Sequence, residues 1–331
     1  MPMPYSLRQA IEEQAAAQSL SALTEAAAEL SQKYREQTFP DKPFIAGEAH
    51  RLAYAAVRMP ATFAAASAAL AEAAHLAPEL KIETLLDLGA GTGAASWAAM
   101  ESFDSLRQVT LIEQDRQLIE LGRKLAQASE HDALRLAEWR AANLRTLREF
   151  TPHDLVLCSY SLGEIATAAP ILNAAWQASQ KLLVIIEPGT MKGFEVIRAA
   201  REQLIEAGGF LLAPCPHRDA CPMALSKNDW CHFAARFERS ALHRRLKGGT
   251  LGYEDEKFSY VAFAKQAAQS APARILRHPL RHAGYTQLQL CAAGGLQTVT
   301  VTKRDKEAWR RVRKADWGDA WDNGSTNNPA E

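Results

Sequence analysis

Hydrophobic and polar positions follow two different patterns along the chain. From residue 5 to about residue 80, apolar residues recur at helical spacing, as in LTEAAAEL and FAAASAALAEAAHL. This pattern predicts several helices, joined near Phe39-Pro40 and Met59-Pro60 because proline interrupts helices. From Glu83 onward, short apolar runs alternate with segments of helical periodicity. The change marks the start of a different architecture.

Four apolar runs have the composition of buried parallel strands: ETLLDL, QVTLIE, DLVLCSY and KLLVIIE. Each is followed by a segment that reads as a helix: AASWAAMES, RQLIELGRKLAQAS, AAPILNAAWQAS and GFEVIRAAREQLIEAG. This alternation predicts an α/β fold with a doubly wound, Rossmann-like sheet. Later strands are expected at FSYVAFAK and at TQLQLC and LQTVTVT, which join around Gly294-Gly295, and these extend or cap that sheet.

The pattern divides the chain into four regions. We expect a helical N-terminal region at 1–80, a ligand-binding Rossmann-like core at 81–210, a cysteine-bearing region with the remaining strands and basic segments at 211–320, and a flexible tail at 321–331. With 331 residues and 47% hydrophobic content, the chain has enough apolar surface for one large core that carries additions.

Composition restricts the compartment and the partners. No uncharged apolar run reaches about 18 residues, so no membrane association is expected, and the start of the chain does not resemble a secretory leader. The five cysteines are an odd number, which argues against a disulfide framework and for reduced thiols. The sequence therefore predicts a cytoplasmic protein.

Charge is balanced overall but unevenly distributed. A formal net charge of zero argues against coating nucleic acid by bulk charge. Basic residues nevertheless gather in three successive clusters of the second half, which together favour an anionic partner, although each cluster alone is also typical of a solvated helix face. The clusters are Arg236, Arg239, Arg244, Arg245 and Lys247; Arg274, Arg277 and Arg281; and Lys303, Arg304, Lys306, Arg310, Arg311, Arg313 and Lys314.

A glycine-rich loop follows the first expected strand, in the sequence Asp87-Leu88-Gly89-Ala90-Gly91-Thr92-Gly93. Glycines at this position allow a tight turn and close approach of a ligand to the main chain. Glu113 ends the second expected strand, at the distance where a carboxylate can accept hydrogen bonds from ribose hydroxyls. The loop therefore predicts a nucleotide-type ligand.

The loop chemistry distinguishes two ligand classes. A pyrophosphate would be repelled by Asp87, whereas the amino group of S-adenosylmethionine (SAM) would be attracted. The pattern resembles the class I methyltransferase signature, which implies Asp87, Gly89, Gly91 and Gly93 near the methionine part and Glu113 on the ribose. Asn143 would lie by the adenine, or alternatively serve only as a turn residue.

The acceptor pocket of such an enzyme would open where the fourth strand ends, in DLVLCSYSLGEI. Ser159, counted with the cofactor-binding residues, lies there with Tyr160 and Glu164, but each can also simply complete the strand-helix junction. The Asn/Asp-Pro-Pro-aromatic motif of nucleic-acid amino methylases is absent, and DNA is not an expected partner. No catalytic base is identified, which does not exclude methyl transfer by positioning alone.

Three cysteines, Cys215, Cys221 and Cys231, have the spacing C-x5-C-x9-C in a polar, proline-rich loop. Neighbouring thiolates repel one another, so their proximity predicts a metal. The irregular spacing, with Cys291 as a remote fourth ligand, is typical of iron-sulfur ligation. Zinc remains the alternative, with His217 or His232 in place of Cys291. Cys158, inside a strand, is expected to be a small core residue.

The motifs resemble a known family, the mitochondrial small-ribosomal-subunit-associated methyltransferase-like proteins and their bacterial relatives. The likeness covers most of the chain from about residue 50. Its most specific part is the cysteine stretch with its continuation. The segments that carry it are AYAAVRMPATFAA, LLDLGAGTGAASWA, DLVLCSYSLGEI, IIEPGT, APCPHRDACPM, DWCHFAARFERSALHRRLKGGTLGYEDEKFSYVAFAK and VTKRDKEAWRRVRKADWGDAW.

The resemblance implies a class I methyltransferase fold, a [4Fe-4S] site and association with the small ribosomal subunit and its 16S rRNA. The implied cluster ligands are Cys215, Cys221, Cys231 and Cys291. Two functions are compatible with it: a SAM-dependent methyltransferase acting on the small subunit, or a non-catalytic assembly factor that binds rRNA through its basic half. A nicotinamide-dependent oxidoreductase is disfavoured by Asp87.

Overall fold

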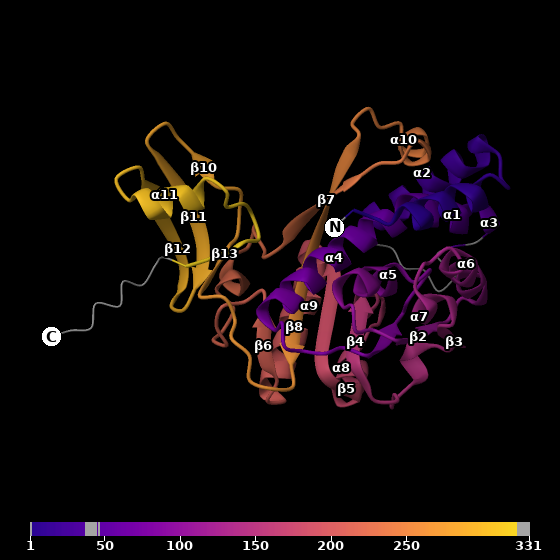
Figure 1. Cartoon of the computed structure of the whole chain (residues 1–331), viewed down its shortest axis with the longest axis horizontal. Coiled ribbons are helices and arrows are strands. Elements are labelled where there is room, and N and C mark those ends of the chain that lie inside the picture. Colours follow the sequence, from indigo (N-terminus) through magenta and orange to yellow (C-terminus); the bar gives the residue numbers. More distant parts are fainter. Residues whose placement is uncertain (1, 37–44, 46, 323–331) are drawn as a thin grey trace.

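The computed structural model describes residues 2–36, 45 and 47–322 (Figure 1). Its α-helices are α1 (Tyr5–Ala15), α2 (Leu20–Glu36), α3 (Glu48–Val57), α4 (Met59–Leu76), α5 (Ala94–Ser102), α6 (Arg116–Ala126), α7 (Asp132–Arg135), α8 (Ala169–Ala178), α9 (Met191–Glu206), α10 (Ala241–Lys247) and α11 (Lys306–Val312). Short 3-10 turns are η1 (Leu144–Thr146), η2 (Leu162–Glu164) and η3 (Pro222–Leu225). The strands are β1 (Thr84–Leu88), β2 (Gln108–Glu113), β3 (Glu138–Ala141), β4 (His153–Ser159), β5 (Ser179–Pro188), β6 (Phe210–Ala213), β7 (Phe233–Glu238), β8 (Tyr253–Ala264), β9 (Ala273–Ile275), β10 (Leu280–Arg281), β11 (Tyr285–Ala292), β12 (Gly295–Thr302) and β13 (Ala320–Trp321).

The larger sheet confirms the α/β prediction. Its strand order is β3-β2-β1-β4-β5-β8-β6, and the neighbours from β3 to β5 run parallel. Strand β8 lies antiparallel between β5 and β6 and also pairs with β7. The chain order reverses between β1 and β4, which places a crevice at the carboxyl ends of these strands. This arrangement is a doubly wound α/β fold with a mixed sheet.

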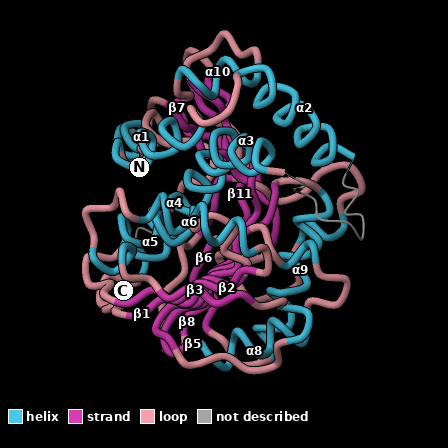
Figure 2. Tube along the Cα trace, turned by 90° about the vertical axis from the view of Figure 1, so that its right-hand side faces the viewer, coloured by secondary structure: helices cyan, strands magenta, loops and turns pink. Residues whose placement is uncertain are grey.

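Helices cover both faces of this sheet, as Figure 2 shows for α4, α5 and α6 on one side and α8 and α9 on the other. The strands alternate accordingly. Leu85, Leu157 and Val184 pack into the core on the side of α4 and α5, and Leu86 and Val156 pack into the core on the side of α8 and α9. Cys158 is fully buried on the latter side, as expected of a core residue.

The N-terminal helices extend the first core toward the crevice. Helix α4 packs closely on α5 and β8, while α10, at the tip of the β7–β8 hairpin, packs on α2 and α3. The predicted interruption at Met59-Pro60 lies between α3 and α4, where Arg58 separates the two helices. The interruption predicted at Phe39-Pro40 lies outside the described residues. No helix within the described ranges has the length and apolar character needed to cross a membrane.

The C-terminal strands form a second sheet instead of extending the first. Its order is β10-β11-β9-β13, with β12 paired to β11. The difference has a packing reason: Leu288, Leu290 and Val301 form a separate hydrophobic cluster with Ala308 and Val312 of α11. Trp321, which the sequence assigned to the tail, is buried in this cluster as part of β13. The other tail residues, from 323 onward, lie outside the described part.

Candidate functional site

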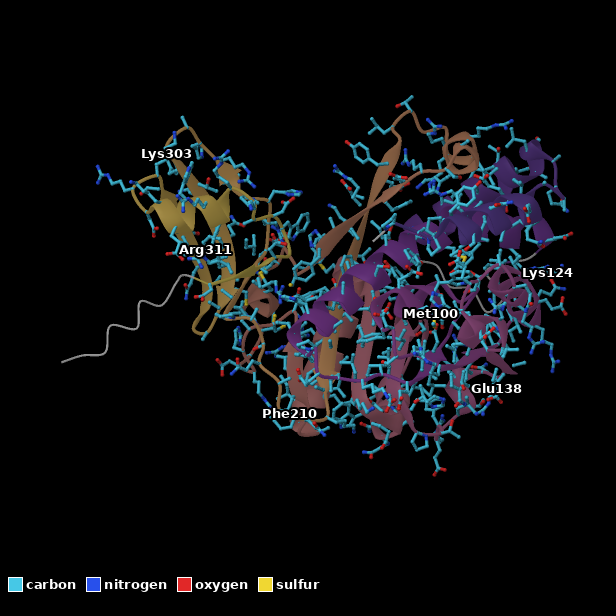
Figure 3. The ribbon with its side chains drawn as sticks, in the orientation of Figure 1. Met100, Lys124, Glu138, Phe210, Lys303 and Arg311 are labelled. Carbon is cyan, nitrogen blue, oxygen red and sulfur yellow. The ribbon has the colours of Figure 1, made fainter. Side chains whose placement is uncertain are left out.

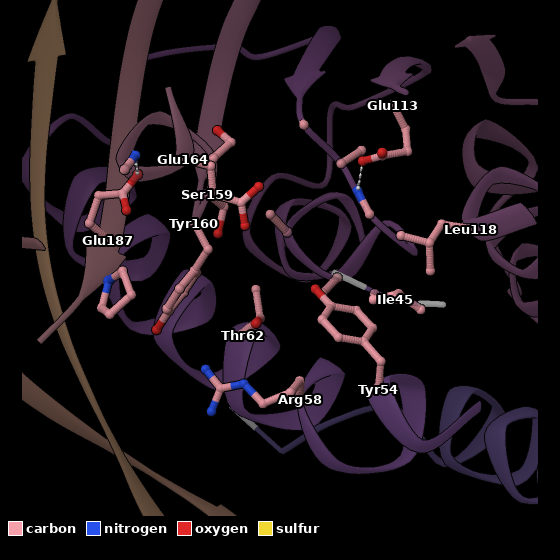
Figure 4. A pocket seen from close by; sticks show the side chains of 18 of the residues that line it. Ile45, Tyr54, Arg58, Thr62, Glu113, Leu118, Ser159, Tyr160, Glu164 and Glu187 are labelled. Atoms are coloured by element: carbon pink, nitrogen blue, oxygen red, sulfur yellow. Dashed lines mark hydrogen bonds between the residues drawn. The ribbon is translucent and has the colours of Figure 1, made fainter. Parts of the chain in front are cut away.

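A cavity of about 2070 Å³ opens at the carboxyl ends of β1, β2 and β4. Its walls come from the glycine loop, from the segments after β2, β4 and β5, and from helices α3 and α4 (Figure 4). Six of the seven predicted cofactor residues line it: Asp87, Gly89, Gly91, Glu113, Asn143 and Ser159. The seventh, Gly93, caps the N-terminus of α5. The sheet topology therefore brings the predicted residues together.

The glycine loop has the backbone shape that only glycine adopts readily. Gly89, Gly91 and Gly93 have φ values of +77°, +57° and +87°. A Cβ atom on Gly89 would also lie 2.5 Å from the Cβ of Ser161. Both the torsion and the available space therefore require glycine at position 89.

Asp87 is fully buried and only partly satisfied. Its Oδ2 accepts a hydrogen bond from Ser96 Oγ at 2.8 Å, whereas Oδ1 has no hydrogen-bond partner among the described residues. Burial raises the pKa of the Asp87 carboxyl to about 7, with a smaller contribution from Glu113. An orphaned buried carboxylate oxygen at the wall of a cavity fits a cationic group of a ligand.

Glu113 holds the loop as well as facing the cavity. Its Oε2 accepts from the backbone N–H of Gly91 at 2.9 Å, and its Oε1 accepts from Gln114 and Asp115 at 2.7 and 2.9 Å. Burial raises its pKa, and these backbone hydrogen bonds lower it in part. Since a carboxylate has about four acceptor positions, about one remains for a ligand hydroxyl.

Asn143 and Ser159 have different surroundings. The Asn143 side chain accepts from the N–H of Arg145 at 2.9 Å and caps η1, the turn role that the sequence offered as the alternative. Its position on the cavity wall leaves the adenine role compatible with the structure. Ser159 Oγ is buried with no partner among the described residues, so it is available to a ligand.

The acceptor side of the cavity contains a network that the sequence analysis missed. Tyr160 has a left-handed backbone, with φ of 56°, and its hydroxyl donates to Glu256 at 3.0 Å. Arg58 forms an ion pair with the same carboxylate at 3.1 Å. A non-glycine residue at positive φ is strained, and such strain concentrates at functional sites. The signal available beforehand was Tyr54, Arg58 and Thr62, spaced to lie on one helical face in AYAAVRMPATFAA.

Two further carboxylates are buried at the cavity. Glu187 Oε1 accepts from the N–H groups of Leu162 and Gly163 at 2.9 and 3.1 Å. Burial raises the pKa of Glu187 to about 7, and burial together with Glu113 does the same for Glu164. Sequence analysis named Glu164 but not Glu187, although IIEPGT marked the latter segment. Three carboxyl groups at the cavity wall, those of Asp87, Glu164 and Glu187, thus have a pKa raised to about 7.

All four predicted cysteine ligands line one second, small cavity of about 40 Å³. Cys215, Cys221 and Cys231 come from the segment between β6 and β7, and Cys291 comes from β11 of the second sheet. Burial, followed by the charge of neighbouring thiolates, raises the pKa of Cys231 well above normal and that of Cys291 to about 12. Among the described residues, however, no three His, Cys, Asp or Glu side chains are arranged to hold a metal ion. The fold therefore brings the four thiols to one cavity, and the metal site predicted there is not shown among the described residues.

The two candidate histidines lie differently. His217 Nε2 is 3.5 Å from Cys291 Sγ, so His217 borders the cysteine cavity. His232 Nδ1 instead contacts the carbonyl of Trp230, and its ring packs against Trp317. Three arginines also line the cavity, Arg198, Arg201 and Arg274. Arg201 donates to the carbonyls of His217 and Asp219, and the fully buried Arg274 donates to that of Pro214. The donor set fits a group that needs four thiolates and nearby positive charge.

Comparison with known proteins identifies relatives of this chain. Residues 48–322 match the family model described as "Mitochondrial small ribosomal subunit Rsm22". The human ribosome assembly protein METTL17, mitochondrial, is 27% identical over 309 residues, covering 86% of this chain and 65% of that protein. The two mitochondrial Rsm22-cox11 tandem proteins of Schizosaccharomyces pombe are 23% identical, covering 72% of this chain and 38% of theirs. The chain thus spans less than two thirds of these relatives.

Two of the solved structures that the chain resembles are methyltransferases. Magnesium protoporphyrin IX methyltransferase from Synechocystis, with bound SAM, matches 71% of this chain and 90% of its own at 12% identity and a TM-score of 0.39. The match to the mitomycin 7-O-methyltransferase MmcR covers 64% of this chain and 56% of MmcR, at 14% identity and a TM-score of 0.38. The relatives found by sequence correct one prediction: a cytoplasmic location is contradicted, because the family model and these curated relatives are described as mitochondrial.

Proposed function

Because the chain belongs to the mitochondrial small ribosomal subunit Rsm22 family, we propose that it is a SAM-binding, methyltransferase-like protein that acts in assembly of the small ribosomal subunit and methylates one of its components. The name of the human relative, a ribosome assembly protein, supports the assembly role. The methyltransferase-like sheet supports the cofactor.

The observation that carries the cofactor proposal is the unpartnered Oδ1 of Asp87 at the wall of the large cavity. In our proposal this oxygen accepts a hydrogen bond from the amino group of SAM, and Gly89 and Gly91 let the methionine part approach the main chain. Glu113 binds the ribose with its remaining acceptor position, and Asn143 lies by the adenine. Bound SAM supplies the electrophilic methyl group.

The residues of the acceptor side position a second substrate. Tyr160 is held by Glu256 and Arg58, so its ring keeps a fixed direction beside Ser159. Both residues line the large cavity, which an external acceptor would have to enter for methyl transfer. Methyl transfer from a sulfonium needs the acceptor atom in line with the leaving sulfur, and such positioning can account for about 7–11 kcal/mol of a barrier. We assign no general base.

A non-catalytic assembly factor is the second candidate. The human relative is described as a ribosome assembly protein. In this version SAM binding serves folding or regulation, and the same residues bind the cofactor without turnover. Single-turnover transfer of radioactive methyl from SAM to immature small subunits distinguishes the two functions.

We also propose that Cys215, Cys221, Cys231 and Cys291 hold a [4Fe-4S] cluster. The chemistry of the donor set supports this: four thiols from two parts of the chain border one cavity, with three arginines to balance thiolate charge. Zinc remains the alternative, with His217 beside Cys291 as its possible ligand. The group would join the second sheet to the core.

The function is tested by two measurements on the full chain. Calorimetry with SAM should show one site, and Asp87→Ala should weaken binding because the amino group loses its acceptor. Co-sedimentation with small ribosomal subunits, compared with large subunits as the control, tests the partner. Absence of both SAM binding and small-subunit binding would refute the proposal.

A further inference from the structure

One face of the β11–β12 hairpin is exposed from Tyr285 to Gln289 and along the paired part of β12, whereas Cys291 at the end of β11 is buried. In β11, Thr286, Leu288 and Leu290 are buried, while the alternating positions point to the other side. The register pairs Tyr285, Gln287 and Gln289 of β11 with Thr302, Thr300 and Thr298 of β12, and it pairs Cys291 with the exposed Leu296. We call this surface the open face; it consists of Tyr285, Gln287, Gln289, Thr298, Thr300 and Thr302, all exposed except the half-buried Gln287.

The open face lies in a stretch that carries no negative side chain. No aspartate or glutamate occurs from residue 257 to residue 304. Exposed Lys303 and Arg304 directly follow β12, and the N–H of Lys303 donates to the carbonyl of Gly284, next to Tyr285. Figure 3 shows Lys303 on this second sheet, away from the core. The electrostatic character of the face and its rim therefore suits a polyanion.

An aromatic pair stands at the same end of the face. The exposed rings of His282 and Tyr285 stack with centroids 4.4 Å apart and an interplanar angle of 20°. A flat, exposed aromatic pair beside basic side chains is the arrangement on which an unpaired base can stack. The amides of Gln287 and Gln289 can both donate to and accept from base edges.

The other two basic clusters are partly engaged within the protein, with Arg244 and Arg245 of the first cluster exposed on α10. Arg236 pairs with Asp255, and Arg239 and Lys247 pair with Glu254. In the second cluster Arg274 is buried, Arg277 pairs with Asp229, and Arg281 donates to the carbonyls of Val312 and Ala315. The third cluster keeps its exposed cations and begins at the edge of the open face. Charge complementarity therefore favours this end of the molecule.

We propose that the open face binds single-stranded RNA. The inference rests on the proposed function and names the surface by which the chain contacts ribosomal RNA. Tyr285, backed by His282, stacks on a base; Gln287, Gln289 and the threonines bond base edges; and Lys303 and Arg304 contact phosphates. A duplex is a poorer ligand because its bases are stacked on each other and closed to the tyrosine.

The face is also fixed relative to the core. Cys291 lies on the same side of β11 as Tyr285, Gln287 and Gln289, at the end of the strand where it meets the cysteine cavity. The open face therefore begins at this junction and extends away from it.

The experiment measures binding of the full chain to a labelled oligouridylate and to a duplex RNA of equal length, over a salt series. Tyr285→Ala should weaken oligouridylate binding about 5- to 150-fold, the loss of one base stack, without changing the salt slope. The double variant Lys303→Gln, Arg304→Gln should reduce the slope by about 1.4, since each single-strand phosphate contributes about 0.7. Tyr5→Ala, at an exposed tyrosine of α1, is the matched control and should change neither quantity.

Several outcomes overturn the inference. Unchanged affinity of Tyr285→Ala, or equal loss with Tyr5→Ala, removes the stacking role. Tighter binding of duplex than of oligouridylate contradicts the single-strand assignment. If Tyr285→Ala no longer co-sediments with small subunits but binds oligouridylate with unchanged affinity, the face binds a ribosomal protein instead. If the wild type sediments with small subunits and Tyr285→Ala does so equally, the face is not the contact although the proposed function stands.

Discussion

Asp87 and Glu113 end neighbouring strands, but their carboxylates have different surroundings. Glu113 accepts three backbone N–H bonds, whereas Asp87 accepts one bond from Ser96 and keeps an orphaned oxygen. The first carboxylate therefore stabilises the loop, and the second has most to gain from a cationic ligand.

SAM affinity should rise with pH through about 7. Burial raises the pKa of Asp87 to about 7, so below that pH the carboxyl is protonated and cannot attract the amino group. Because binding uses the deprotonated form, a pKa of 7 predicts affinity about 10-fold lower at pH 6 than at pH 8. Calorimetry at both values checks this, and Asp87→Asn should flatten the profile. An unchanged pH profile in Asp87→Asn would assign the titration to another group.

The same raised pKa predicts that stability falls as pH rises. An unfolded aspartate has a pKa near 3.9, so between about pH 4 and pH 7 the folded protein binds more protons at Asp87 than the unfolded chain does. The free energy of unfolding should therefore decrease over this window for wild type relative to Asp87→Asn. Urea denaturation at pH 5 and pH 7 measures it, and parallel curves for the two proteins would contradict the assignment.

Glu113→Ala should weaken SAM binding by about 1.5–3 kcal/mol, or roughly 10- to 150-fold, the usual loss for a charged hydrogen bond. Calorimetry is the measurement, with the exposed Glu138→Ala on β3 as the control. Because Glu113 also holds Gly91, an analogue without ribose hydroxyls separates the two effects. If Glu113→Ala weakens binding of this analogue as much as it weakens binding of SAM, Glu113 acts through the loop and not through the ribose.

At the scale of elements, the loop between β1 and α5 shapes the site by combining unusual torsions with close packing. Gly89 and Gly208 have nearly the same left-handed torsion, φ of +77° and +80°, but a Cβ atom on Gly208 would meet nothing within 4 Å. The pair therefore separates torsional strain from steric exclusion.

Gly208→Ala should cost about 1–2 kcal/mol of stability from the torsion alone and leave SAM binding intact. Gly89→Ala should cost more and should abolish SAM binding, because its Cβ meets Ser161 and the loop must shift. Urea denaturation gives the stabilities, and calorimetry gives the affinities. Equal stabilities and normal SAM binding in both variants would show that the loop is not closely packed.

At the scale of the whole molecule, the cysteine cavity joins parts that are distant in sequence. Cys291 brings β11 to the loop of the other three cysteines. Arg274 on β9 forms an ion pair with Glu72 of α4, with 2.6 Å between Nη2 and Oε1. Arg274 also donates to Pro214 at 3.0 Å and to Gly318 at 2.9 Å. The second sheet is therefore held to the core at the cysteine site.

Wild-type protein purified without oxygen should be brown and contain iron and sulfide. The Cys291→Ser variant should lack both iron and sulfide. Without its fourth ligand the second sheet should also loosen, visible as faster hydrogen exchange in β9 and β11. Cys158→Ala, in the core sheet, is the matched control and should retain iron. Zinc as the only metal would reverse the cluster assignment and leave the zinc alternative.

The sequence by itself determined the local structure, because strand and helix periodicity, proline breaks and the glycine loop are encoded by neighbouring residues. It predicted β1, β2, β4 and β5, the helices after them and the clustering of Asp87, Glu113 and Ser159, since parallel strands present their carboxyl ends at one edge. Only the tertiary structure decided which distant segments meet. It inserted β8 into the core sheet, formed the second sheet around α11, and brought Arg58 and Glu256 to Tyr160. These contacts depend on the packing of whole surfaces, which no short stretch of sequence specifies.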